Sequence, residues 1–157
     1  MAVAYRIAKR KFAKSKKEIM SGRGALLYGG RWTGPGRPVV YASQSLALAT
    51  LEVAVHLIRT DKLRAYRTIS LEIPDEIVLP IDRDALPDNW DEIAVEPKAV
   101  QDWGNAWFDN QLSVVMAVPS VVIPAESNYL INPEHPDFKL IVQGRLEKHP
   151  FDPRIKA

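Results

Sequence analysis

Two residues in the first third of the chain are of types that bind or cleave charged substrates. The first is Arg31, which lies in the run YGGRWTGPGRPVVYAS, residues 28–43, among four glycines and two prolines. Glycine permits close backbone approach, and arginine binds a phosphate or carboxylate through two parallel hydrogen bonds. The run is therefore a candidate phosphate-binding loop. An ordinary turn explains the glycines as well, and the spacing matches neither the P-loop nor the dinucleotide-binding fingerprint.

The second residue is Glu52, the only formally charged residue in the apolar stretch 46–58. A helix that is apolar almost all round is normally buried, and a carboxylate in it is costly unless it is paired or faces a cleft. Two interpretations remain open. Glu52 either serves chemistry in a cleft, or forms an exposed stripe with His56 and Arg59, which follow it at i+4 and i+7.

Three polar side chains lie beside expected strands. Tyr41 ends an apolar strand, where an aromatic ring belongs to the core or forms the wall of a pocket. Ser127 and Asn128 follow an apolar strand within AESNYLINP, where turn formation is the alternative reason for their presence. The three histidines lack the spacing of metal ligands, so we predict no metal site.

The elements that must position these residues alternate between strands and two main helices. Hydrophobic patterning predicts strands at 5–8, 37–43, 65–74 and 138–152, helices at 46–60 and 97–111, and two short strands or one bulged strand at 113–124. A strict βαβ rhythm is absent from this order. The pattern favours an α+β domain over a doubly wound parallel sheet.

Length and composition are those of an ordinary globular domain. The chain has 157 residues, of which 46% are hydrophobic and 25% charged, so we expect a single domain over 1–157. No apolar run is long enough for a membrane span, and the N-terminus has no apolar core of a secretory signal. The lack of cysteine excludes disulfides and thiol catalysis, and fits a cytoplasmic protein.

The net charge of +2 is small, but the charge is unevenly distributed. Six basic residues and no acidic one lie between Lys9 and Lys17, whereas residues 82–96 are mainly acidic and are expected to form a surface loop. The basic run is either a solvated surface segment or a binding site for an acidic partner or a phosphate backbone.

Three blocks of the sequence together resemble one family. The blocks are GRGALLYGGRW, PVVYASQSLALATLEVAVHL and VPSVVIPAESNYLINPEHPDF, and in this order they resemble the RES domain, the toxin half of a bacterial toxin–antitoxin system. The family is named after an Arg, a Glu and a Ser, which match Arg31, Glu52 and Ser127. Tyr41 matches a further active-site position. The stretch 74–97 shows no resemblance.

The resemblance implies a mixed, split β-sheet like that of ADP-ribosyltransferase toxins, flanked by helices, with NAD⁺ as substrate and no further cofactor. Glu52 would stabilise the cationic ribose that forms when the nicotinamide bond breaks. Arg31 would hold the pyrophosphate and Tyr41 would wall in the nicotinamide. Ser127, with Asn128 beside it, would hydrogen-bond the nicotinamide or its ribose.

The resemblance also implies partners and leaves the acceptor open. It implies an Xre-type helix-turn-helix antitoxin that covers the active site, contact with DNA only through that antitoxin, and a toxin dimer within the complex. No membrane contact is expected. The ADP-ribose acceptor is water, phosphate or a protein. A different class, a non-catalytic nucleic-acid-binding module that uses the basic run, has no use for Glu52.

Overall fold

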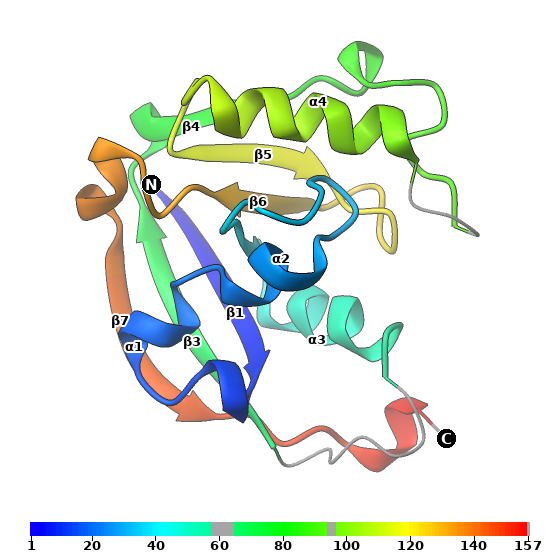
Figure 1. Cartoon of the computed structure of the whole chain (residues 1–157). Helices are drawn as coiled ribbons and strands as arrows, with labels where there is room; N and C mark the ends of the chain where they lie inside the picture. Colours follow the sequence, from blue (N-terminus) through cyan, green and yellow to red (C-terminus); the bar gives the residue numbers. More distant parts are fainter. Residues whose placement is uncertain (58–64, 94–96, 157) are drawn as a thin grey trace.

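Seven strands form one mixed sheet in the part of the chain that the structure, a computed structural model, describes: residues 1–57, 65–93 and 97–156 (Figure 1). The strands are β1 Ala2–Lys9, β2 Val40–Ser43, β3 Tyr66–Ile73, β4 Val78–Pro80, β5 Val115–Pro119, β6 Ser127–Ile131 and β7 Val142–Lys148. Their order is β4-β5-β6-β2-β1-β3-β7, and only β4 and β5 pair in parallel among these neighbours.

Four α-helices and five 3₁₀ turns connect the described strands. The helices are α1 Lys16–Ile19, α2 Arg23–Tyr28, α3 Leu46–Ala54 and α4 Lys98–Asp109, and the 3₁₀ turns are η1 Arg10–Phe12, η2 Asp75–Ile77, η3 Arg83–Ala85, η4 Pro136–Leu140 and η5 Pro153–Lys156. This mixture confirms the predicted α+β class. Among the described residues, no helix has the length and apolarity needed to cross a bilayer.

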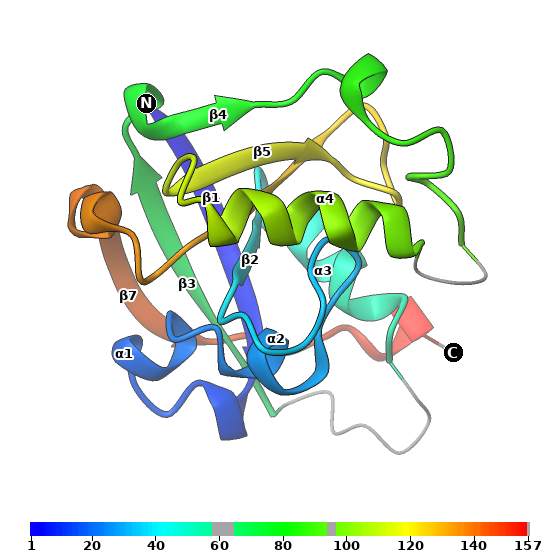
Figure 2. The same ribbon diagram turned by 45° about the horizontal axis from the view of Figure 1, so that its top comes forward.

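The sheet is split into two halves at the junction of β1 and β2. These two strands share the single pair Tyr5–Ser43, whereas β1 pairs with β3 along its whole length, from Ala2 to Lys9. Figures 1 and 2 show the consequence: β1, β3 and β7 run across the direction of β4, β5 and β6. The split sheet that the resemblance implies is confirmed.

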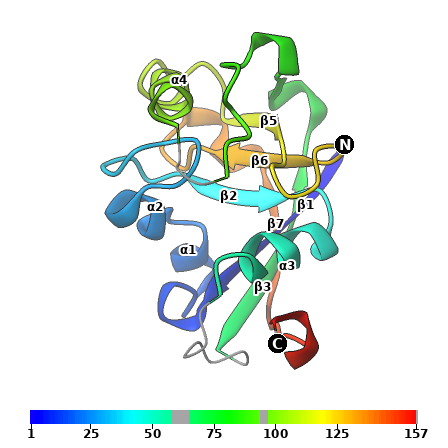
Figure 3. The same cartoon turned by 90° about the vertical axis from the view of Figure 1, so that its right-hand side faces the viewer.

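The two faces of the sheet are covered differently. On one face a continuous core joins Ala4 and Ile69 to Ile19 at the end of α1. On the other face the apolar core is divided between two helices, as Figure 3 shows with α4 above strand β2 and α3 below it. Polar side chains can therefore lie on this face, between the two clusters.

Two of the predicted elements have different bounds. The predicted helix at 46–60 begins as expected, because the Ser45 hydroxyl accepts a hydrogen bond from the Leu48 amide (3.0 Å), but α3 ends at Ala54. Residues 58–60 lie outside the described residues. The strand predicted at 138–152 is reduced to β7, Val142–Lys148, since Pro136–Leu140 forms η4. The other predicted bounds differ by at most about three residues.

The prediction of a second strand directly after Pro119 is wrong. Residues 120–126 form a turn, closed by the Ser120 amide on the Glu126 carbonyl (2.9 Å), and the strand β6 begins at Ser127. The turn-forming residues of β6 are extended because both edges of this strand are paired, one with β5 and the other with β2.

Candidate active site

Glu52 on α3 is held by side chains from the end of β5 and the start of β6. Its Oε1 accepts hydrogen bonds from the Ser120 hydroxyl and from Asn128 Nδ2, each 2.6 Å long. The Ser43 hydroxyl of β2 donates to Asn128 Oδ1 (2.7 Å), which fixes the orientation of the amide. We call these four residues the Glu52 cluster. Its three neutral members are buried, and Glu52 itself is half-buried.

The hydrogen bonds leave one carboxylate oxygen of Glu52 for a ligand. Ser120 Oγ accepts from the amides of Val122 and Ile123 (3.1 and 3.0 Å), so its single hydrogen is available for Glu52. Both side-chain donors bind Oε1, and within the described residues no hydrogen bond reaches Oε2. The arrangement orients the carboxylate firmly while one oxygen stays unused.

These contacts decide between the two interpretations of Glu52. A residue of an exposed stripe does not accept hydrogen bonds from two buried side chains. His56, the second member of that stripe, is exposed, and Arg59 lies outside the described residues. The interpretation of Glu52 as a residue of a polar site is therefore the one that the structure supports.

Residues 29–37, which we call the glycine turn, carry Arg31 and are held by α4. Gln101 Nε2 donates to the Gly30 carbonyl (2.7 Å), and the Gly34 amide donates to Asn105 Oδ1 (2.9 Å). At the end of the turn, Arg37 forms a bidentate ion pair with Asp109 (2.8 and 2.7 Å). The hydrogen bonds from Arg37 lower the pKa of Asp109 below its ordinary value. Three separate contacts thus fix the turn to one helix.

Arg31 itself has few contacts. It is half-buried, and its Nη1 donates to the Trp90 carbonyl (3.2 Å). No carboxylate of the described residues pairs with it, and no hydrogen bond within that part of the chain reaches its other nitrogens. A half-buried guanidinium without an anionic partner is a suitable site for a phosphate or carboxylate group.

Tyr41 lies between the glycine turn and the Glu52 cluster. Its hydroxyl is 2.7 Å from Thr33 Oγ1, and a Cβ at Gly30 would come within 2.9 Å of that hydroxyl, so the turn packs closely against the Tyr41 ring. Tyr41 and Ser43 alternate with Ala42 along β2 and therefore share one face of the sheet. The structure thus brings Arg31, Tyr41, Glu52 and Asn128 to the same face.

The backbone of Tyr41 is fixed by Arg6 from the neighbouring strand. Arg6 Nη1 donates to the Tyr41 carbonyl (3.1 Å), and Nε donates to the Ile19 carbonyl (2.7 Å). Desolvation by burial lowers the pKa of Arg6 to about 10. The guanidinium remains charged at neutral pH and serves as a fixed donor for the strand end.

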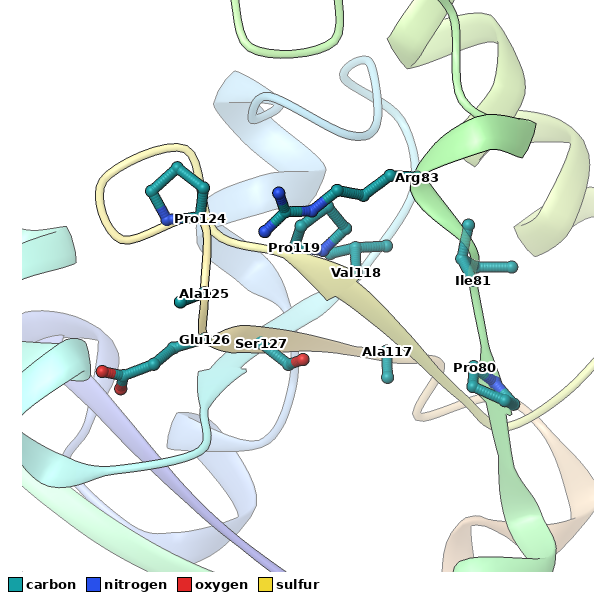
Figure 4. Close-up of a pocket in the computed structure, with 10 residues that line it drawn as sticks. All are labelled: Pro80, Ile81, Arg83, Ala117, Val118, Pro119, Pro124, Ala125, Glu126 and Ser127. Atoms are coloured by element: carbon teal, nitrogen blue, oxygen red, sulfur yellow. The ribbon is translucent and has the colours of Figure 1, made fainter.

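The structure places the side chain of Ser127 apart from the Glu52 cluster. Ser127 alternates with Asn128 along β6, so its side chain lies on the opposite face from the Glu52 cluster. Figure 4 shows it in a pocket of about 200 Å³ whose lining includes Pro119, Arg83 and Ala117. The hydroxyl that contacts Glu52 belongs to Ser120. The signal for it was a polar residue at the end of an apolar strand, directly after a proline.

The segment 82–96, predicted as an acidic surface loop, contributes to the site through its described residues 82–93. The Trp90 ring stacks on Trp32, with centroids 6.3 Å apart and planes 25° apart, while the Trp90 carbonyl binds Arg31. The Arg83 guanidinium lies 5.9 Å from the centre of the Trp90 ring. Sequence patterning could not predict the contact between Arg31 and Trp90, because these residues lie 59 positions apart.

The site combines one residue that can bind an anion with one that can stabilise a positive charge. Arg31 can bind an anionic group and Glu52 can stabilise a positive charge, with an aromatic residue between them along the chain. Among the described residues, no group of three or more His, Asp or Glu side chains is placed to hold a metal ion.

Comparison with known proteins places the chain in one family. Residues 3–152 match the RES domain. Toxin Res of Photorhabdus laumondii is 38% identical over 136 residues, which cover 87% of this chain and 85% of that protein. The Prs ADP-ribosylating toxin of a Sphingobium species is 38% identical over 139 residues, which cover 87% of this chain and 86% of that protein.

A solved structure has the same fold. It is the Mycobacterium tuberculosis MbcT-MbcA toxin–antitoxin complex, of which one chain aligns with a TM-score of 0.74 at 19% identity, covering 95% of this chain and 84% of that one. The family match, together with relatives of similar length, is the conclusion of the comparison: this chain belongs to the RES domain family.

Proposed function

We propose that the chain is the toxin of a toxin–antitoxin system and that it consumes NAD⁺ by cleaving the nicotinamide–ribose bond, which arrests growth. Membership of the RES domain family and the names of its relatives support the toxin role. The observation that carries the chemistry is the half-buried Glu52 carboxylate, held at Oε1 by two donors while Oε2 accepts no hydrogen bond from the described residues.

In the proposed reaction the bond between the ribose C1′ and the nicotinamide nitrogen breaks, and its electron pair leaves with neutral nicotinamide. The ribose then carries a positive charge, which Glu52 Oε2 stabilises. Water or phosphate forms the new bond to C1′, and water releases a proton in doing so. The enzyme is then a glycohydrolase or a phosphorylase.

The remaining residues bind the substrate in this proposal. Arg31 holds the pyrophosphate, since its guanidinium lacks a carboxylate partner among the described residues. Tyr41 forms the wall of the nicotinamide site beside the turn. Asn128 uses one Nδ2 hydrogen to orient Glu52 and has a second for the substrate.

The direct test is incubation of the purified chain with NAD⁺, followed by quantification of nicotinamide. We expect release of nicotinamide by the free chain, and a KM for NAD⁺ that rises about tenfold or more in Arg31→Ala, since a charge-assisted bond is lost. Arg145→Ala, which removes an exposed arginine of β7, is the matched control. Unchanged NAD⁺ with the free wild-type chain contradicts the proposal.

A second candidate is transfer of ADP-ribose to a protein. The printed name of the Sphingobium relative, an ADP-ribosylating toxin, favours it. The two reactions use the same residues and differ in what attacks C1′. NAD⁺ labelled in its adenylate half separates them, because transfer leaves the label on protein, whereas hydrolysis or phosphorolysis leaves it in a small molecule.

The partners follow from the resemblance and from the solved complex. A relative of the same fold was solved with an antitoxin, which supports an antitoxin for this chain. The Xre type of that antitoxin, a toxin dimer within the complex and a cytoplasmic location stay predictions. Light scattering on the purified complex measures the stoichiometry, and two toxin chains per particle is the expected result.

A further inference from the structure

The basic run at residues 9–17 has a defined structure that packs on the rest of the chain. Ala13, in the middle of the run, is fully buried. The Ser15 hydroxyl caps α1 by accepting from the Glu18 amide (3.1 Å), and Glu18 Oε1 accepts from the Lys14 amide (3.1 Å). Arg67 of β3 donates to the Ala13 carbonyl (3.1 Å). The positions of the lysines are therefore fixed relative to the sheet.

Cations from two further strands join this run at one corner of the molecule. Figures 1 and 2 show η1 and α1 beside the start of β3 and the end of β7. Arg67 and Lys148 lie directly opposite each other across β3 and β7, and like charges in that position are destabilising. Together with Arg10 they line a pocket of about 400 Å³, whose described lining contains no carboxylate.

We call these cations the basic patch, which consists of Arg10, Lys11, Lys14, Lys16, Lys17, Arg67 and Lys148. Within the described parts of the chain, none of them forms an ion pair. Glu18 is the one carboxylate of α1, directly after the run, and its Oε1 accepts from the Lys14 amide, so the seven cations leave a net positive charge that a bound polyanion would neutralise.

The composition of the patch indicates which polyanion it fits. Protein interfaces have an apolar core inside a polar rim. The exposed large apolar side chains of the described residues all lie elsewhere, for example on α2 and α3. A surface of mainly lysine and arginine, with Tyr66 and Pro150 beside them in the lining of the pocket, fits a phosphodiester backbone, which is bound chiefly by charge.

The basic patch and Glu52 lie on opposite faces of the sheet. Ile19 at the end of α1 packs with Ala4 and Ala8 of β1, whereas Ala49 of α3 packs with Ile7. Neighbouring residues of a strand point to opposite faces. A ligand on the patch therefore leaves the NAD⁺ site open.

We propose that the basic patch binds the phosphodiester backbone of nucleic acid, without sequence specificity. This contact belongs to the chain itself and is additional to the one through an antitoxin that the resemblance implies. It is independent of the proposed cleavage of NAD⁺.

The test measures binding of a short labelled DNA duplex and of a single-stranded RNA by fluorescence anisotropy over a series of salt concentrations. The variant is Lys14→Gln/Lys16→Gln/Lys17→Gln, whose three side chains are exposed. The control, Lys98→Gln/Lys139→Gln/Arg154→Gln, removes the same charge from exposed positions elsewhere. Because each phosphate contact contributes about 0.9 to the salt slope on duplex DNA, we expect the variant to lose roughly 2 to 3 units of slope and about tenfold or more in affinity.

Three outcomes overturn the proposal: no binding of either nucleic acid by the wild type at low salt, an equal loss in the control, or binding of polyglutamate alone, which indicates an acidic protein partner. The DNA and RNA arms distinguish the two sources of the backbone. NAD⁺ turnover and the melting temperature are expected to stay unchanged in the variant. If it does not fold, Lys11→Gln/Lys148→Gln provides the same comparison.

Discussion

At the scale of single residues, the account depends on how Glu52 is held. A carboxylate on a helix surface is usually solvated at both oxygens, whereas Glu52 accepts two short hydrogen bonds at Oε1 from Ser120 and Asn128. Both donors are buried and are themselves fixed by further hydrogen bonds. The cluster is therefore preorganised, which is the condition for stabilising a charge that develops during a reaction.

Ser120→Ala tests this arrangement. The substitution removes one of the two donors that orient Glu52 Oε1, so we expect kcat for NAD⁺ cleavage to fall roughly tenfold or more, which corresponds to about 1.4 kcal/mol. It also leaves the amides of Val122 and Ile123 without their acceptor, which costs about 1–3 kcal/mol of stability. Steady-state kinetics below the melting transition separate the two effects.

The control for this substitution is Ser127→Ala on the opposite face of the sheet. We expect its kcat to stay near that of the wild type, because its side chain does not reach the Glu52 cluster. A larger loss of turnover in Ser127→Ala than in Ser120→Ala would return the serine of the site to Ser127, where the sequence resemblance places it.

At the scale of elements, α4 determines the position of the glycine turn. The helix contacts the turn through the side chains of Gln101 and Asn105 and through close backbone packing at Gly104, which lies between them. A Cβ at Gly104 would lie 1.7 Å from the Trp32 carbonyl oxygen, so helix and turn approach as closely as a glycine allows. Arg31 directly precedes Trp32, so the packing of Trp32 against Gly104 also fixes the backbone position of Arg31.

Gly104→Ala is therefore expected to reverse the usual effect of alanine in a helix. In an exposed helix interior the change stabilises by about 1 kcal/mol. Here we expect a loss of roughly 1–3 kcal/mol from overpacking, with a higher KM for NAD⁺ as the turn shifts. Gly24→Ala in α2, where a Cβ meets nothing within 4 Å, is the control and should not destabilise. Urea unfolding of both variants measures the difference, and equal midpoints would contradict the packing argument.

The sequence predicts elements better than it predicts the contacts between them. The start of α3 follows from a Ser45 cap and an apolar run, and both are local signals. The strand β6 was missed because its residues favour turns locally, and it is extended only through pairing on both edges. Ser120 and Trp90 join the site through contacts across 68 and 59 positions, which no periodicity encodes.

At the scale of the whole molecule, the C-terminal segment after β7 joins α3 to strand β3. His149 Nε2 is 3.1 Å from Thr50 Oγ1 on α3, and Phe151 packs edge-on against Tyr66 with centroids 4.9 Å apart. The segment therefore supports the helix that carries Glu52, from the side opposite to α4. Desolvation by burial lowers the pKa of His149 below its ordinary 6.5.

This shift predicts the direction of a pH effect on stability. Below pH 6.5 the unfolded chain takes up a proton at His149 more readily than the folded chain does, so the free energy of unfolding falls as the pH decreases. We expect His149→Gln to reduce this pH dependence, and His56→Gln, at an exposed position, to retain it. Urea midpoints at neutral and mildly acidic pH measure both. An unchanged dependence in His149→Gln would contradict the role of this side chain.

The measurement that tests the central claim most directly is the rate of nicotinamide release from NAD⁺ by Glu52→Gln. The glutamine keeps the shape and can still accept hydrogen bonds, but it lacks the negative charge. We predict a kcat at least about a hundredfold below that of the wild type. Glu72→Gln, which removes an exposed carboxylate of β3, is predicted to release nicotinamide at the wild-type rate. Equal turnover by Glu52→Gln and the wild type would contradict the account.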